Sequence, residues 1–388
     1  MRIAHLANFY GPTSGGLRTA MHALGRGYSA AGHEVLLIVP GPAHAEEKLP
    51  EGRRITVRSP VVPFTGGYRV ILRRGRVRRL LRDFGPDVVE VSDRTTLRGV
   101  GRWARRRRIP SVFFAHERAD GVLLANSPRW LVPRRFARFL ADAHNRGTSR
   151  RFTTIVCTTA YAAEEFERVG LPTVTISLGV DLDLFRPSNY SQELRDSFAR
   201  SEETLLVMGS RLSKEKHPEL AIGAVSELGS RGHQVRLVCA GSGNLDERMR
   251  EDAAGLPVTF LGFVGERQRF ADLLATADVV LAPGPIETFG LAALEALASG
   301  TPVVVNASSA LPEVVGPAGV GSANNPESFA DGVESLLHVD SVERRMRARE
   351  RAEQFPWSKT CAQMLALHGE NLAHYSQERQ EHRNGGDS

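Results

Sequence analysis

The sequence predicts an α/β fold of two Rossmann-like domains that face each other across a cleft, and three observations lead to this prediction. The first is length, because 388 residues exceed what one hydrophobic core usually serves. The second is that short apolar strands alternate with helical stretches in each half of the chain. The third is that these strands lack polar alternation, which is typical of parallel strands covered by helices on both faces.

The N-terminal half predicts a first parallel sheet. A strand over Arg2–Ala7 leads into a glycine-rich loop and then a helix over Leu17–Ala31, which Gly32 ends. Further strands are expected where short apolar runs recur in this half. These runs are Val35–Val39, Val88–Val91, Ser111–Ala115 and Thr154–Cys157.

A second series of strands begins near residue 204 and predicts a second sheet of the same kind. A helix over His217–Leu228 separates its first two strands. The expected strands are Leu205–Gly209, Val235–Ala240, Val258–Leu261, Val279–Ala282 and Pro302–Val305.

Turn residues and a proline set the expected domain limits. The segment Leu178–Pro187 is rich in turn residues and lies between the two series, so the linker is expected there. Pro356 interrupts the last helical pattern, since proline cannot continue a helix interior. We therefore expect an N-terminal domain over 1–180 and a C-terminal domain over 181–355. Residues 356–388 are expected to form a helix that returns to the N-terminal domain, followed by a frayed tail.

The composition is that of an ordinary soluble globular protein, with 41% apolar and 24% charged residues. Cys157, Cys239 and Cys361 are odd in number and far apart, so we expect small buried hydrophobes rather than disulfides or metal ligands. The apolar run at the N-terminus is too short for a signal peptide, and no run of eighteen apolar residues occurs. A cytoplasmic protein is expected.

The loops that follow strands are the expected place of a binding site in such sheets. The loop from Asn8 to Gly16 has glycines that lead into a helix N-terminus, which favours a phosphate, although a merely tight turn needs the same residues. The loop from Gly209 to Pro218 carries Arg211 and Lys216. These cations would neutralise a diphosphate leaving group, unless they are ordinary solvated charges.

The third loop, from Pro283 to Gly290, carries the strongest signal. Glu287 precedes a helix and Glu295 lies on it, eight residues further along. The loop amides from Phe289 to Leu291 lie at the helix N-terminus, where phosphate oxygens bind. Carboxylates in such a loop accept hydrogen bonds from sugar hydroxyls and are unsuited to binding an anion directly. A single Glu there would be only a partner of the helix dipole, but two of them make that reading weak.

This segment resembles the Glu-x7-Glu motif of family 4 glycosyltransferases, which have the GT-B fold. The Gly15-Gly16 loop, the pair of Arg211 and Lys216, the linker and Leu297–Val304 match the same pattern. The resemblance extends over roughly the whole chain up to residue 360 and implies a sugar donor activated by a nucleotide. It also implies retention of anomeric configuration without a required metal or other cofactor.

The resemblance implies a role for each matching residue. Glu287 would hold hydroxyls of the donor sugar and Glu295 those of the ribose, while Arg211 and Lys216 would grip the diphosphate. His116, after the strand that ends at Ala115, would position the sugar and steady developing charge, although a lone histidine is more often structural. The remaining donor residues are the phosphate-facing backbone groups and the nucleobase slot. They are Gly15, Gly16, Phe289, Gly290 and Leu291 for the phosphates, with Phe263 and Val264 for the base.

Two acidic residues of the linker are not expected to bind a metal. Asp181 and Asp183 imitate an Asp-x-Asp metal motif, but they lie in the linker and not after a catalytic strand. No metal site is therefore expected there. Glu287 is not assigned as a covalent nucleophile, because the family implies same-face attack assisted by the departing phosphate.

An excess of arginine in the N-terminal half predicts an anionic partner. Between Arg53 and Arg108 there are seventeen arginines and four acidic residues. Read as a helix, Leu72–Arg82 has an apolar stripe of Val77, Leu80 and Leu81 beside a cationic face, as expected of an element that lies on anionic lipid. A solvated helix docked on its own sheet would show the same pattern. The cations are Arg73, Arg74, Arg76, Arg78, Arg79 and Arg82.

A narrower resemblance is to the actinobacterial phosphatidylinositol mannoside mannosyltransferases. It rests on Ala7–Pro12, Thr65–Arg69, Glu90–Arg94 and Ala115–Arg118. It implies GDP-mannose as the donor, a mannosylated phosphatidylinositol as the acceptor and a peripheral position at the inner face of the plasma membrane. The residues expected to face the acceptor are Tyr10, Tyr68, Arg69 and Asp93.

Three alternatives stay open, because fold and donor motif do not determine the acceptor. The first is a related enzyme that acts on a soluble acceptor such as an inositol phosphate. The second is a nucleic-acid-binding protein that uses Arg102–Arg108, which lacks interleaved aromatic residues. The third is a sugar-binding module without catalytic activity, although all the expected donor positions are occupied.

Overall fold

A computed structural model of the chain describes residues 1–11, 15–63, 67–121 and 134–384. Residues 12–14 of the glycine-rich loop, residues 65–66 of the expected acceptor segment and the last four residues of the tail lie outside the described part. The chain divides into two compact units, one of Met1–Leu178 with Trp357–Ser388 and one of Gly179–Pro356. These limits differ by no more than two residues from those expected from the sequence.

The first unit contains an eight-stranded sheet in the order β3-β4-β2-β1-β5-β6-β7-β8. Neighbouring strands are parallel except β3 and β4, which pair antiparallel at the sheet edge. The strands are β1 (Arg2–Ala7), β2 (Glu34–Gly41), β3 (Ala45–Leu49), β4 (Gly52–Arg58), β5 (Val88–Ser92), β6 (Ser111–Ala115), β7 (Thr154–Cys157) and β8 (Val174–Thr175).

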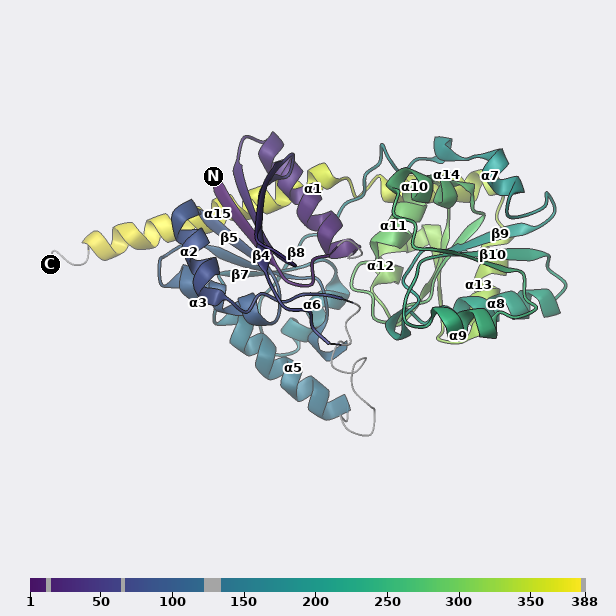
Figure 1. Cartoon of the computed structure of the whole chain (residues 1–388), viewed down its shortest axis with the longest axis horizontal. Coiled ribbons are helices and arrows are strands. Elements are labelled where there is room, and N and C mark those ends of the chain that lie inside the picture. The colour runs from purple at the N-terminus through teal and green to yellow at the C-terminus, as the bar shows by residue number, and fades with distance from the viewer. Residues whose placement is uncertain (12–14, 64–66, 122–133, 385–388) are drawn as a thin grey trace. The chain divides into compact units, whose positions relative to one another are not determined.

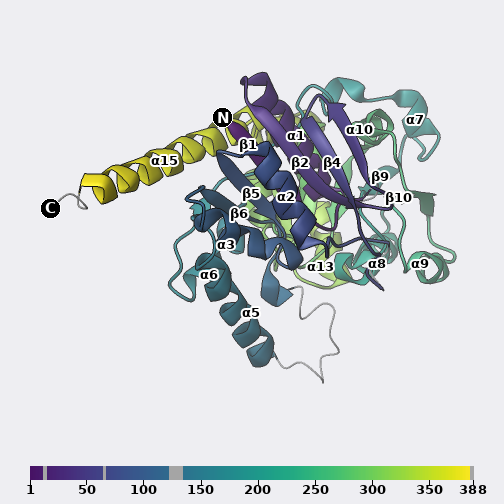
Figure 2. The ribbon, with the colours of Figure 1, turned by 60° about the vertical axis from the view of Figure 1, so that its left-hand side comes forward.

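The sheet of the first unit is covered by helices, and one of them comes from the far end of the chain. The C-terminal α15 packs along α1, and both can be followed in Figure 1 and Figure 2. The helices are α1 (Gly16–Ala30), α2 (Arg74–Phe84), α3 (Gly99–Arg105), α5 (Arg134–Ser149), α6 (Ala160–Glu167) and α15 (Trp357–Asn384), with a 3-10 turn η1 (Thr96–Arg98). The last segment of the chain is therefore part of the N-terminal unit.

Helix α2 corrects one interpretation of the arginine-rich segment. Its apolar residues Val77 and Leu81 are buried in the core of the first unit, and Leu80 packs against that core. The apolar stripe therefore covers the helix's own sheet and is not available to enter a lipid layer. The six arginines proposed to face the membrane are all exposed, so this surface retains only its charge.

The second unit contains a six-stranded, fully parallel sheet in the order β11-β10-β9-β12-β13-β14. Its strands are β9 (Thr204–Met208), β10 (Val235–Ala240), β11 (Val258–Gly262), β12 (Val279–Ala282), β13 (Val303–Asn306) and β14 (Gly319–Ser322). Helices α8, α9 and α13 lie on one face of this sheet and α10, α11 and α14 on the other (Figure 1).

The second unit has eight described α-helices and three 3-10 turns. The helices are α7 (Gln192–Asp196), α8 (Pro218–Ser230), α9 (Asp246–Asp252), α10 (Arg267–Thr276), α11 (Leu291–Ala298), α12 (Leu311–Val315), α13 (Pro326–Leu337) and α14 (Ser341–Ala352). The turns are η2 (Pro187–Asn189), η3 (Lys214–Lys216) and η4 (Gly316–Ala318).

Both sheets have a point where the direction of strand addition reverses. The strand β1 lies between β2 and β5, and β9 lies between β10 and β12. Open α/β sheets bind ligands beyond the carboxyl ends of the strands at such points, because the loops there diverge to opposite faces. The loops after β1 and β5, and those after β9 and β12, are therefore the places where a site is expected.

Candidate functional site

The loops that follow β9 and β12 bring two of the predicted donor residues into contact. Lys216 ends η3, and its Nζ forms an ion pair with Glu287 Oε1 from the loop before α11. The two side chains remain 21% and 24% exposed, so a ligand can reach both. The fold therefore joins the predicted diphosphate cation to the predicted sugar-binding carboxylate, 71 residues apart in sequence.

Arg211 lies on the same loop and has its own carboxylate partner. Its Nη2 is 3.1 Å from Glu215 Oε1, and nearly half of the arginine side chain is exposed. Burial alone would raise the pKa of Glu215, but the Ser213 hydroxyl and the charges of Arg211 and Lys216 hold the pKa below its usual value. The loop after β9 thus presents two cations, each already paired with a carboxylate.

The start of α11 is held in one conformation by packing. Gly290 caps the helix with φ at 78°, and a Cβ atom there would lie 2.1 Å from Leu311 Cδ2. The Phe289 ring is buried against Phe355, with ring centroids 6.2 Å apart. The Phe289 side chain therefore shapes the loop from inside, and only its backbone remains as the group predicted to meet a phosphate. Leu291 opens the helix and is also buried.

Glu295 projects from α11 and has a partner that the sequence did not reveal. Its side chain is buried, and Arg267 Nη2 at the start of α10 lies 2.8 Å from Glu295 Oε1. Burial raises the pKa of Glu295, while the arginine acts in the opposite direction. Arg267 also lies over the ring of Phe185, 4.7 Å from its centroid. A ribose at Glu295 would therefore meet Arg267 as well.

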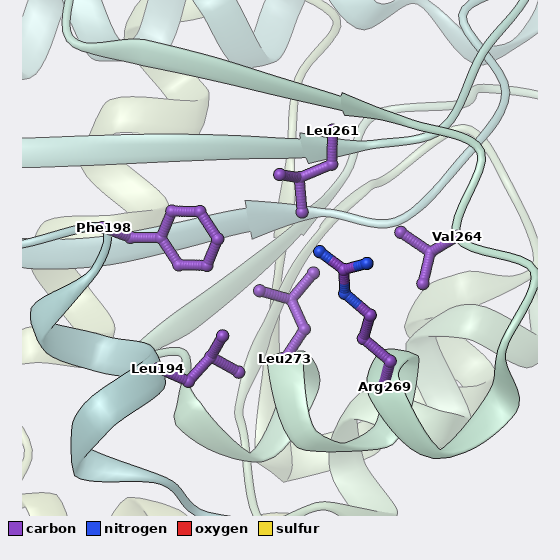
Figure 3. A pocket seen from close by; sticks show the side chains of 6 residues that line it. All are labelled: Leu194, Phe198, Leu261, Val264, Arg269 and Leu273. Atoms are coloured by element: carbon purple, nitrogen blue, oxygen red, sulfur yellow. The ribbon is translucent and has the colours of Figure 1, made fainter.

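The two residues predicted to form the nucleobase slot, Phe263 and Val264, differ in exposure. Phe263 is 56% exposed, whereas Val264 lines a small pocket between α7 and α10 (Figure 3). Arg269 supplies the one polar side chain in that pocket, and apolar residues form the rest. These are Leu194, Phe198, Leu261 and Leu273. Such a lining offers little to the hydrogen-bonding edge of a base, so the pocket is distinct from the predicted slot.

In the first unit, His116 directly follows β6. Its ring stacks on Phe114, with centroids 4.4 Å apart and planes 11° apart. Its Nε2 is 2.9 Å from Ser92 Oγ at the end of β5. Burial lowers the pKa of His116 to about 3, so the imidazole is neutral near neutral pH. A neutral ring is suited to orienting a hydroxyl and is a poor source of positive charge.

The loop after β1 is tied to its neighbours by Asn8, a residue for which the sequence predicts no role. Its Nδ2 donates to Thr96 Oγ1 at 2.8 Å, and its Oδ1 accepts the Ile71 amide at 2.8 Å. Beyond this clamp, Gly15 and Gly16 are exposed at the start of α1. Their exposure agrees with the predicted contact between backbone amides and a phosphate.

Three of the four residues expected on the acceptor side lie near this loop. Tyr68 is half-buried with its ring edge-on to Phe9, and the Arg69 carbonyl accepts the Phe9 amide at 3.2 Å. The Arg69 guanidinium donates to the Ser59 carbonyl at 2.6 Å. The Tyr10 hydroxyl contacts His22 Nε2 at 2.5 Å.

Asp93 does not fit the acceptor role expected of it. The residue is only 4% exposed, and its carboxylate accepts the Thr95 hydroxyl at 2.7 Å and the Leu97 amide at 2.8 Å. Both oxygens thus hold the turn that leads into η1. We correct the expectation accordingly, since Asp93 shapes its own loop.

Two further expectations concern residues outside the site. Asp181 Oδ1 accepts the amides of Asp183 and Leu184, at 3.3 and 3.0 Å, so it caps a turn in the linker. Cys157, Cys239 and Cys361 are all free and buried, which confirms their predicted place in the interior. None of the described helices is long and apolar enough to cross a membrane.

Comparison with known proteins gives matches over nearly the whole chain. The family described as Glycosyltransferase Family 4 matches residues 14–184, and the family described as Glycosyl transferases group 1 matches residues 191–355. A GDP-mannose-dependent alpha-(1-6)-phosphatidylinositol dimannoside mannosyltransferase of Mycobacterium tuberculosis is 47% identical, covering 95% of this chain and 96% of the relative.

Two other matches are more distant. A D-inositol 3-phosphate glycosyltransferase of Mycobacteroides abscessus is 34% identical over 51% of this chain and 46% of its own length. Among solved structures, sucrose-phosphate synthase from Thermosynechococcus elongatus has a TM-score of 0.78 at 21% identity, covering 96% of this chain and all of that one. The structural likeness shows the fold, which is the GT-B arrangement of two parallel-sheet domains.

Proposed function

The chain belongs to glycosyltransferase family 4 and is a glycosyltransferase, and we propose that it transfers mannose from GDP-mannose to a mannosylated phosphatidylinositol. The similarity to the mycobacterial dimannoside mannosyltransferase supports both donor and acceptor, since it covers 95% of the chain at 47% identity. The similarity to an inositol phosphate glycosyltransferase covers only about half of each chain, so a soluble acceptor is less well supported.

The observation that carries the donor assignment is the contact between Lys216 and Glu287 at the end of β9 and β12. The carboxylate accepts hydrogen bonds from sugar hydroxyls, and the ammonium balances charge on the adjacent diphosphate. Arg211 adds a second cation, and the amides at the start of α11 add aligned donors. These groups together fit a phosphate next to a sugar, which is the chemistry of a nucleotide-sugar donor.

We propose that the transfer proceeds with retention, as the family resemblance implies. The bond between mannose C1 and the β-phosphate oxygen breaks, and a bond from C1 to the acceptor oxygen forms on the same face of the ring. The acceptor proton passes to the departing phosphate oxygen, so configuration is retained without a covalent enzyme intermediate. Arg211 and Lys216 stabilise the developing charge on GDP, in the place that a metal ion would otherwise take. Neither a metal nor another cofactor is included in this mechanism.

We assign acceptor recognition to the first unit, at a membrane surface on the cytoplasmic side. The exposed arginines of α2 supply charge for an anionic headgroup, and Tyr10, Tyr68 and Arg69 lie at the loop after β1. Helix α5 supplies exposed apolar groups, because Phe136 and Phe139 are 51% and 63% exposed. Exposed arginines flank these rings on α5, which suits an anionic lipid surface.

The donor assignment is tested by calorimetry with matched nucleotides. GDP and GDP-mannose are expected to bind at least tenfold more tightly than UDP and UDP-glucose, because the base contributes to donor selection. Turnover is then measured with a phosphatidylinositol dimannoside extract and with inositol phosphate as acceptors. Preferential binding of UDP sugars would overturn the donor, and turnover confined to inositol phosphate would overturn the acceptor.

The membrane assignment predicts that exchanging Phe136 and Phe139 together for serine weakens cosedimentation with anionic vesicles by about tenfold or more, since two large apolar side chains lose their burial in lipid. A separate variant with Arg78 and Arg79 changed to serine is also expected to bind these vesicles more weakly, because it loses positive charge. Neither change should affect GDP-mannose hydrolysis.

The matched control changes two exposed apolar residues of α14 in the second unit, Val342 and Met346, to serine. Vesicle binding should then stay at the wild-type level. Equal losses in the α5 and α14 variants, or no loss in either, would contradict the assignment of this surface.

A further inference from the structure

We propose that a buried chain of polar side chains, running from α15 to His116, determines which nitrogen of His116 carries the proton and how the ring is oriented. We call it the buried polar chain. It consists of His368, Glu90, His5, Ser92 and His116 in that order. Its first four members are positioning residues for the transfer reaction. This inference rests on the proposed function only for the role of His116.

The geometry of the buried polar chain follows from the order of the strands. His5 of β1 is paired in register with Glu90 of β5, so the two side chains lie next to each other. His5 Nδ1 is 3.0 Å from Glu90 Oε2, and His5 Nε2 is 2.9 Å from Ser92 Oγ. The first of these contacts has an ion-pair distance but poor hydrogen-bond alignment.

Both ends of the buried polar chain are within hydrogen-bond distance of their neighbours. His368 Nε2 of α15 is 2.6 Å from Glu90 Oε1, so a buried side chain of the C-terminal helix reaches the central strand β5. Ser92 Oγ is 2.9 Å from His116 Nε2. The polar contacts therefore run without a gap longer than 3.0 Å from the C-terminal helix to the predicted catalytic histidine.

Glu90 sets the direction of the hydrogen bonds because it is an ionised acceptor. Burial by itself would raise its pKa, but His5, His368 and Tyr28 outweigh that effect and hold the pKa below its usual value. A carboxylate has no proton to donate, so a ring nitrogen or hydroxyl within about 3 Å must turn a proton toward it and not a lone pair. Tyr28 does so at 2.8 Å, and His5 must carry a proton on Nδ1, since two facing lone pairs would repel.

The proton positions then follow one after another. Burial lowers the pKa of His5, so a ring with a proton on Nδ1 has an unprotonated Nε2. The Ser92 hydroxyl must donate to that nitrogen, which leaves its oxygen to accept a hydrogen bond from His116 Nε2. His116 is therefore held with its proton on Nε2 and its lone pair on Nδ1. A fixed tautomer decides which ring nitrogen accepts a hydrogen bond from a hydroxyl group.

Stability alone is a poor explanation for this arrangement. The neighbours of Glu90 on β5 are Val88, Val89 and Val91, which show what the central strand of a sheet normally contains. A buried carboxylate with its partners is often no more stabilising than apolar residues of similar volume. Buried ionisable clusters that end at a candidate catalytic residue are more typical of functional sites.

The experiment compares Ser92→Ala with Ser92→Thr in the full chain, using ¹⁵N NMR of the histidine rings and steady-state kinetics. Signals of His116 are assigned from their loss in His116→Gln. The wild type and S92T are expected to show His116 with the proton on Nε2, because threonine keeps the hydroxyl. In S92A we expect a mixture of tautomers and a kcat lower by roughly tenfold or more, with the KM for GDP-mannose within about twofold.

The far end of the buried polar chain is tested with His368→Gln and His368→Leu. Glutamine keeps a donor near the position of Nε2 and should preserve both readouts, whereas leucine removes the donor and should shift them in the direction of S92A. An unchanged His116 tautomer in S92A overturns the proposal whatever the activity. A shifted tautomer with unchanged kcat overturns the positioning role.

The result is separable from the proposed function. If the wild type fails to use GDP-mannose, the donor assignment fails, while the tautomer comparison still decides whether the buried polar chain controls His116. If GDP-mannose is used and the tautomer does not respond to Ser92, only the inference about the buried polar chain fails.

Discussion

Replacing Lys216 by methionine is expected to lower kcat/KM for mannose transfer by about 10²-fold or more, because it removes a positive charge aimed at the leaving diphosphate. Methionine is an unbranched side chain only one atom shorter than lysine and keeps most of its packing, so the protein should remain folded. Lys214 on the same 3-10 turn is exposed and provides the matched control. Lys214→Met is expected to retain turnover within about twofold, since exposed charges away from a bound ligand contribute little.

The ion pair with Glu287 makes a sharper test possible. Glu287→Gln keeps the shape but weakens acceptance of sugar hydroxyls, and we expect at least a tenfold loss of turnover. Because Lys216 and Glu287 contact each other, the double variant should lose less than the product of the two single losses. Near-normal rates in both single variants would mean that the donor site lies elsewhere. Strictly multiplicative losses would contradict a functional coupling of the pair.

The central strands were predictable because their signal is local. Val279–Ala282 is apolar throughout and Val235–Ala240 is apolar except for Arg236, and the bounds of both strands agree with the expected ones. The edge strand Ala45–Leu49 was missed because solvent on its outer side permits a polar sequence. Helix α2 was predicted, but the same apolar stripe is expected whether a helix covers a sheet or a membrane. Only the packing of Val77 and Leu81 distinguishes the two.

The sequence predicted which loops form the candidate site, but it did not predict which side chains contact one another there. Motif spacing located the segments of Lys216, Glu287 and Glu295, yet their partners depend on which strands are neighbours. Arg267 lies 28 residues from Glu295 and has no motif of its own. His5 and Glu90 did carry a signal, since each is a charged or polar residue with apolar residues on both sides in its strand. Such interruptions mark buried polar clusters, but the sequence does not say which residue completes them.

Replacing Gly290 by alanine is expected to cost roughly 2–5 kcal/mol of unfolding free energy in the second unit, from left-handed backbone strain together with overpacking. The φ of 78° disfavours any residue with a Cβ atom, and that atom would lie 2.1 Å from the buried Leu311 side chain. A midpoint of thermal unfolding lower by about 10 °C is the expected size of the effect. The start of α11 should also shift, so GDP binding should weaken.

Gly255 separates the two contributions to this loss. It has φ at 81°, and a Cβ atom there would meet nothing within 4 Å, so Gly255→Ala tests the backbone strain alone. Its expected cost is about 1–2 kcal/mol, with GDP affinity unchanged. The excess in Gly290→Ala then measures the steric conflict with Leu311. If both variants lose the same stability and both bind GDP normally, the packing at the start of α11 does not shape the phosphate site, and the donor assignment would depend on the side chains of Arg211, Lys216 and Glu287 alone.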